Sequence, residues 1–156
     1  MPTFLNRLKI TILYFTGGFL AALSSLIFSA LFLYTSHNAN LWLTAAGVFL
    51  EEIVKLFFLI KLSVAKKNKP VVFLNIKSTL IKAFFFGGGF AFLEALLVAI
   101  NPALSLNISF LANLTIHFFT SLFLLGAISR FRSMPVVALF FFWLAFLIHL
   151  CYNIFK

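Results

Sequence analysis

"GVFLEEIVKLFFLI", residues 47–60, places two adjacent glutamates and a lysine inside an otherwise apolar stretch. With its flanks the stretch is long enough for a helix that crosses a lipid bilayer, which takes about 20 residues. Charged side chains at such a depth cost roughly 2.5–3.5 kcal/mol each on insertion scales. We therefore expect Glu51, Glu52 and Lys55 to face the interior of a helical bundle rather than lipid.

The whole chain has the composition of an integral membrane protein. Of its 156 residues, 63% are hydrophobic and 10% are charged, and the mean hydropathy is +1.15. A soluble domain of this size would need far more charge on its surface. One cysteine, Cys151, excludes a disulfide within the chain. These features predict an all-α integral membrane protein, a bundle of about five transmembrane helices.

Five spans are predicted, at about residues 10–35, 41–62, 79–100, 108–128 and 134–155, with turn-forming sequences between them. Arg7 and Lys9 precede the first span, as they would in a secretory signal. The apolar stretch is longer than a signal core and lacks a clear A-x-A site, so we interpret it as a retained helix. No repeat or linker is apparent, which indicates a single domain over residues 1–156.

The basic residues predict the orientation of the chain in a cell membrane. The connections "TSHNAN" and "NPALSLN" contain no lysine or arginine, whereas the amino terminus and the other two connections contain most of the twelve. By the positive-inside rule the amino terminus is cytoplasmic and the carboxyl terminus is outside. The basic residues concerned are Arg7, Lys9, Lys61, Lys66, Lys67, Lys69, Lys77, Lys82, Arg130 and Arg132. Aromatic residues then fall near the outer interface, at Tyr34, Trp42 and Tyr152.

The net charge of +9 does not indicate a nucleic-acid partner. No aromatic-interleaved basic patch or nucleic-acid motif accompanies the basic residues. Their position at the membrane edges suits contact with anionic lipid headgroups instead. The lipid bilayer is therefore an expected partner and nucleic acid is not.

All three acidic residues and two of the three histidines lie inside predicted spans. The helix rise of about 1.5 Å per residue places Glu51, Glu94, His117 and His149 at roughly 9–15 Å below the outer surface. Glu52 adjoins Glu51 in the same span. Four helices would thus bring ionisable groups to one level. We expect a polar cavity in the outer half of the bundle.

Local spacings suggest how these residues associate. Glu51 and Lys55 are four residues apart, so they share a helix face and can pair. His149 and Asn153 have the same spacing. Three consecutive glycines, Gly87–Gly89, permit neighbouring helix backbones to approach closely in a membrane. The spacings favour a tight bundle around a polar interior.

Carboxylates, imidazoles and an amide from separate helices suit the activation of water. Two histidines and a carboxylate can equally bind zinc and leave an open coordination position. A structural ion pair with hydrogen-bonded histidines is the simpler alternative. The motifs HExxH and GxSxG are absent. "NIS" at 107 and "NLT" at 113 match glycosylation sequons, a match as often accidental as functional.

The motifs occur in an order that resembles a known family. E-E-x-x-K ends at Lys55, F-x-x-x-E joins Phe90 to Glu94, a lone histidine lies within a span at His117, and H-x-x-x-N ends at Asn153. This order is similar to that of the PrsW family of intramembrane metalloproteases, relatives of the type II CAAX prenyl proteases and bacteriocin-immunity proteases. The resemblance covers about residues 47–153, four of the five spans.

The resemblance implies roles for several residues. Glu51 or Glu52 would be the base that activates water, with Lys55 as its charge partner. Asn153 would support the oxyanion or His149. The protein would then be an intramembrane endopeptidase that cleaves a single-pass membrane protein near its extracytoplasmic end.

The resemblance also implies a metal site. Glu94, His117 and His149 would be catalytic or would coordinate a divalent metal, with zinc expected. The CAAX branch typically has a histidine where this chain has Glu94, which favours the PrsW branch over a prenylated substrate. Two other functions stay open: a small transporter or metal-ion binding protein, in which glutamates and histidines relay protons or cations, and a catalytically silent membrane scaffold.

Overall fold

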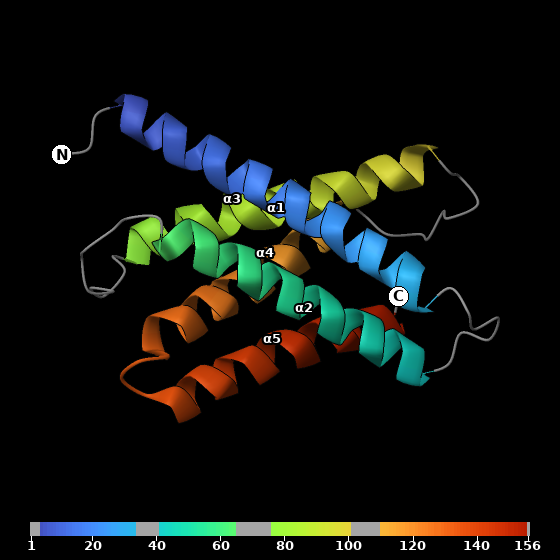
Figure 1. Cartoon of the computed structure of the whole chain (residues 1–156). Helices are drawn as coiled ribbons and strands as arrows, with labels where there is room; N and C mark the ends of the chain where they lie inside the picture. The colour runs from blue at the N-terminus through green and yellow to red at the C-terminus, as the bar shows by residue number, and fades with distance from the viewer. Residues whose placement is uncertain (1–3, 34–40, 65–75, 101–109, 156) are drawn as a thin grey trace.

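The computed structural model describes residues 4–33, 41–64, 76–100 and 110–155, and these residues form five helices (Figure 1). A short turn at residues 131–134 separates the last two helices. The expectation of an all-α fold with five helices is confirmed, and no strand occurs in the four described ranges. The helices are α1 Phe4–Leu33, α2 Leu41–Val64, α3 Ile76–Ile100, α4 Phe110–Arg130 and α5 Pro135–Phe155.

Two helices begin earlier than the apolar pattern predicted. α1 begins at Phe4 and includes Lys9, and α3 begins at Ile76 and includes Lys77 and Lys82. Long basic side chains can extend along a helix toward polar surroundings, so they do not have to end it. Several sequence-based expectations lie outside the described residues, namely those on Tyr34, Lys66, Lys67, Lys69 and the span ends at 35 and 108–109.

Four of the five helices, α1, α3, α4 and α5, are long and apolar enough to cross a membrane. The remaining helix, α2, has 24 residues but carries four charged side chains. The chain therefore has the character of a multi-pass membrane protein. The charges of α2 are Glu51, Glu52, Lys55 and Lys61.

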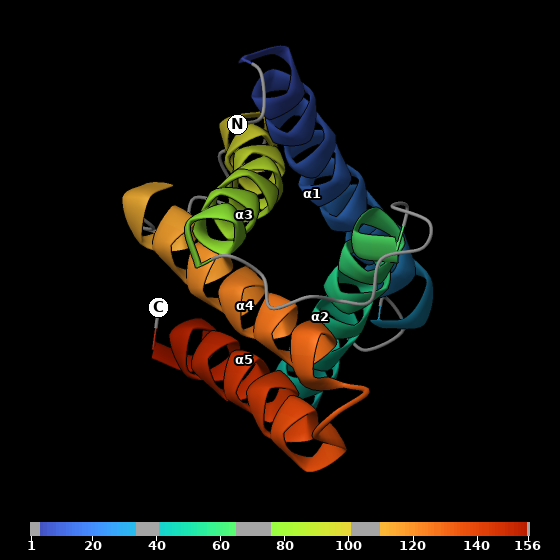
Figure 2. The same ribbon diagram turned by 90° about the vertical axis from the view of Figure 1, so that its left-hand side faces the viewer.

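The helices close into a ring when viewed along the bundle (Figure 2). α3 packs between α1 and α4, α5 packs on α4, and α2 packs on α1 and, less extensively, on α5 and α4. In the described part of the chain, the backbones of α2 and α3 do not come close together although the two helices are consecutive. The core is apolar and aromatic, and its fully buried side chains include Leu59, Phe86, Phe90, Leu124 and Leu125.

Glycines bring α3 close to both of its neighbours. A Cβ at Gly87 would lie 2.6 Å from the backbone oxygen of His117 on α4. A Cβ at Gly89 would overlap the backbone carbonyl of Phe15 on α1. The predicted role of the glycines is thus confirmed for these two. Gly88 differs, because its Cβ would meet only a side-chain atom of Leu114 at 3.7 Å.

The described basic side chains at helix ends gather at one end of the bundle. They belong to the start of α1 and α3, the end of α2 and α4, and the turn that follows α4. In this turn, the backbone N–H groups of Ser133 and Met134 donate to the carbonyl of Arg130 at 3.1 and 2.8 Å. This distribution agrees with the positive-inside pattern, and which side of the membrane the end faces stays a prediction.

Candidate functional site

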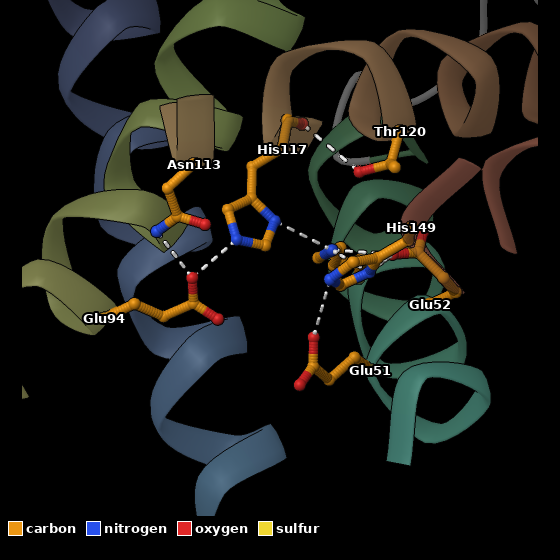
Figure 3. Close-up of polar contacts among 8 residues, drawn as sticks. Glu51, Glu52, Glu94, Asn113, His117, Thr120 and His149 are labelled. Carbon is orange, nitrogen blue, oxygen red and sulfur yellow. Dashed lines mark hydrogen bonds and ion pairs between the residues drawn. The ribbon is translucent and has the colours of Figure 1, made fainter. Parts of the chain in front are cut away.

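Polar side chains from α2, α3, α4 and α5 meet inside the bundle (Figure 3). Glu52 and Lys55 are fully buried, and His117 and His149 are 1% and 2% exposed. Buried charges in proteins are normally paired and hydrogen-bonded, because burial without a partner is costly. Each of the four has a polar partner within this cluster, and among the described residues Oε2 of Glu52 is left without a hydrogen bond.

Lys55 lies at the centre of the polar cluster. Its ammonium nitrogen is 2.6 Å from Oε1 of Glu52, 3.1 Å from Nδ1 of His117 and 3.5 Å from Nδ1 of His149. The same nitrogen lies 4.4 Å from the centre of the Phe90 ring, a cation–π arrangement. Lys55 thereby contacts side chains of three other helices as well as its own.

The sequence predicted that Lys55 pairs with Glu51, four residues away. In the structure its ion pair is with Glu52, three residues away. Both spacings place side chains on one helix face, so spacing alone does not separate them. Glu51 instead lies with its Oε2 3.5 Å from Nε2 of His149. The first of the two glutamates therefore faces an imidazole, and the second holds the lysine.

The tautomer of His117 follows from its partners. A lysine ammonium can only donate, so Nδ1 of His117 accepts from Lys55. Its Nε2–H then donates to Oε2 of Glu94 at 2.7 Å. The side-chain amide of Asn113 donates to the same oxygen, also at 2.7 Å. Two donors on one oxygen orient the Glu94 carboxylate and leave Oε1 to accept from elsewhere.

His149 is oriented by Glu52. Its Nδ1 lies 2.7 Å from Oε1 of Glu52, the distance of a charge-assisted hydrogen bond in which the ring donates. Nε2 of the neutral ring is then a hydrogen-bond acceptor, and it faces the Glu51 carboxylate. Two acceptors that face each other create a place for a proton or for the O–H of a water.

The prediction that Glu51, Glu94, His117 and His149 lie at one level is confirmed by these contacts. The two imidazole centres are only 5.2 Å apart. Asn153, by contrast, makes no hydrogen bond to the cluster within the described ranges. The expected polar cavity in the outer half of the bundle stays a prediction.

Two residues of the polar cluster were missed from the sequence. Asn113 bonds Glu94, and the Thr120 hydroxyl donates to the backbone oxygen of His117 at 3.4 Å. Asn113 lies four residues before His117, and that shared helix face is the signal that could have identified it.

The expected zinc site requires donor atoms that surround one common position. Glu94, His117 and His149 do not converge on one point, and the described residues contain no group of three or more histidine, cysteine or acidic side chains arranged to hold a metal. Nδ1 of His117 and Oε1 of Glu52 point at the ammonium of Lys55, which already provides a cation there. In this arrangement the residues do not fit a zinc ion.

We expect the purified protein to retain less than one-tenth of an equivalent of zinc after incubation with zinc and dialysis. The Lys55 ammonium occupies the position between the donors, and zinc would need about 2.0–2.2 Å contacts to several of them. Zinc content measured by inductively coupled plasma mass spectrometry checks this. A stoichiometric content that disappears in His117→Ala would contradict it.

Comparisons with known proteins do not place the chain in a family. No family model, no curated protein and no solved structure matches it.

Proposed function

We propose that this protein hydrolyses a peptide bond of a membrane protein within the bilayer, with water activated by Glu51 and His149. The proposal rests on two partly exposed carboxylates that adjoin two buried imidazoles. The side chain of Glu51 is 23% exposed and that of Glu94 is 33% exposed. In Figure 3 both carboxylates reach toward the same space from opposite sides. A water and a substrate carbonyl would have to meet there.

Glu51 and His149 form the proposed general base. Nε2 of His149 and Oε2 of Glu51 are both acceptors and lie 3.5 Å apart, so the pair takes up one proton readily. Glu52 holds the ring through Nδ1, which resembles the role of the third group in a catalytic triad. Glu52 itself is buried and ion-paired, so we propose it as a positioning residue. Glu51 is then the proposed base.

Glu94 is the proposed second contact of the reacting water. The donors His117 and Asn113 both bond its Oε2, so Oε1 can accept a hydrogen bond from the water. The water is then held by Glu94 on one side and by the Glu51–His149 pair on the other. Such fixed positioning of a nucleophile is a large part of catalysis.

The proposed reaction consumes only the substrate and one water. The Glu51–His149 pair removes a proton from water as the oxygen attacks the carbonyl carbon. The C–N bond then breaks, and the same proton passes from the pair to the leaving nitrogen. The products are a carboxylic acid and an amine. Asn153 keeps its proposed role beside the oxyanion on the basis of the family resemblance alone.

The membrane arrangement is part of this proposal. With α2 as a fifth span and a cytoplasmic amino terminus, the polar cluster falls in the outer half of the bilayer. The substrate would be a single-pass membrane protein cut near its extracytoplasmic end. The PrsW-like order of motifs supports this assignment, as does the mutual contact of the residues that carry it.

Glu51→Gln and Glu94→Gln are each expected to reduce cleavage at least 100-fold, because each removes a carboxylate that contacts the water. Quantitative membrane proteomics with N-terminal peptide mapping would compare cells that carry the wild type or either variant. The full-length substrate should accumulate and its cleaved fragment should disappear.

Ser121→Ala is the matched control. Ser121 is fully buried on α4 near His117, and within the described ranges its hydroxyl has no hydrogen-bond partner. This variant should cleave at more than half the wild-type level. Fragments that persist in both glutamine variants, with protein levels equal to the wild type, would overturn the hydrolase proposal.

A proton relay is the second candidate function. Glu51, His149, Glu52, Lys55 and His117 follow one another at distances of 3.5 Å or less, and the chain ends at Glu94. Glutamate and histidine chains of this kind carry protons in transporters. Acidification of proteoliposomes that is lost in Glu94→Gln, without any change in substrate fragments, would favour this function.

A further inference from the structure

A large apolar groove lies between α2 and the α4–α5 pair, outside the polar cluster. Its volume is about 810 Å³. The α2 side chains that line it recur at three- and four-residue spacing and so occupy one helix face. The principal apolar lining residues are Ile53, Leu56, Ile60, Ala127, Leu139 and Phe142.

The groove lies between three of the four helices that form the polar cluster, and it extends toward the basic end of the bundle. On α5, Phe142 of the groove and His149 of the cluster are seven residues apart, or roughly 10 Å along the helix. Away from Ser129, Arg132 and Ser133, the groove is lined by apolar side chains. Such a lining suits a hydrocarbon chain rather than a hydrated ligand.

The mouth of the groove is polar and positively charged. Ser129, Arg132 and Ser133 line it where α4 ends and α5 begins. Arg132 is exposed, and within the described ranges no carboxylate pairs with it. The Ser129 and Ser133 hydroxyls donate to the carbonyls of Gly126 and Arg130, at 2.8 and 3.4 Å. The Arg132 guanidinium is therefore the group suited to a phosphate, which it can bind with two parallel hydrogen bonds.

We propose that this groove binds one anionic phospholipid, with an acyl chain between α2 and α5 and the phosphate on Arg132. The positive charge at the mouth of the groove favours an anionic lipid over a transmembrane helix. A transmembrane helix placed here would bring its own basic residues to the basic end of the bundle, by the positive-inside rule, and Arg132 would repel them. An anionic headgroup is attracted by Arg132 and by the other basic side chains of the same end. This inference does not depend on the proposed hydrolase activity.

The test uses the full-length protein reconstituted in vesicles of equal parts phosphatidylglycerol and phosphatidylcholine. After mild solubilisation, mass spectrometry measures the ratio of the two lipids that remain bound. The wild type should be enriched in phosphatidylglycerol. Arg132→Gln should lower the enrichment about fivefold, the effect expected of one basic side chain near an anionic surface.

Arg130→Gln is the matched control for charge. Arg130 lies two residues away, does not line the groove, and its guanidinium donates to Sδ of Met134 at 3.6 Å. Enrichment in this variant should stay within twofold of the wild type. An equal loss in both variants would show a diffuse surface charge effect and would overturn the proposed site.

A phosphatidylglycerol with a photoreactive group in its acyl chain tests the groove itself. Adducts should concentrate on residues 53–60 and 135–142, and Leu139→Trp, which fills the groove, should reduce them at least threefold. Adducts spread evenly over the lipid-facing helices would overturn the proposal. So would a crosslinked second copy of the chain, or a co-purified membrane peptide, in place of the lipid.

Discussion

Lys55→Met is expected to lower the free energy of unfolding by about 3–5 kcal/mol, the largest effect of any single substitution proposed for the polar cluster. Methionine fills a similar volume but removes the ammonium that pairs with Glu52 at 2.6 Å and donates to His117. The buried Glu52 carboxylate then loses its cationic partner and keeps only the hydrogen bond from His149. Unfolding in detergent micelles, followed by circular dichroism, measures the change.

The cause can be isolated by removing both charges. Lys55→Met combined with Glu52→Gln should recover at least half of the lost stability, because no unpaired charge remains and an amide oxygen can still accept from His149. Lys61→Met is the control on the same helix. Lys61 is exposed, so its replacement should change stability by less than about 0.5 kcal/mol. Equal losses in Lys61→Met and Lys55→Met would contradict the buried-pair explanation.

Gly89→Ala is expected to destabilise the bundle by about 3 kcal/mol. The new Cβ would overlap the carbonyl of Phe15, and a backbone atom cannot rotate aside as a side chain can. α1 and α3 would have to separate along their length and lose contact. The same micelle unfolding experiment applies, with size-exclusion chromatography to confirm that the variant is monodisperse.

The adjacent glycine provides the matched control. Gly88→Ala adds a Cβ that meets only Leu114 Cδ1 at 3.7 Å, an ordinary contact. Alanine favours helix over glycine by roughly 0.5–1 kcal/mol, so Gly88→Ala should be neutral or slightly stabilising. If both alanine variants lose the same stability, helix flexibility rather than backbone contact explains the glycines.

The helices and the convergence of the polar cluster could be predicted from the sequence. Apolar length alone defined the helices, because a lipid-exposed helix must be apolar over about 20 residues. A constant rise per residue then placed Glu94 and His117 at one level although 23 residues separate them. These predictions needed no knowledge of which helices are neighbours.

The pairing inside the cluster could not be predicted in the same way. Glu51 and Glu52 are both on the helix face of Lys55, and the choice between them depends on the side chains that α4 and α5 present. Asn113 was missed for the same reason, since its role requires that α3 packs on α4. Asn153 has the right spacing from His149, but neighbouring helices provide it with no partner in the described part of the chain.

Helix spacing is set by main-chain contacts on one side of the bundle and by side-chain contacts on the other. At Gly87 and Gly89 the spacing of α1, α3 and α4 is fixed by main-chain atoms, which no side-chain substitution can resize. The spacing of α2 from α5 depends instead on aromatic rings packed edge to face, where the ring centres of Phe49 and Phe146 lie 5.7 Å apart. Substitutions in related chains would therefore preserve the α3–α4 contact that holds His117 against Glu94. They would adjust the α2–α5 contact that holds Glu51 against His149.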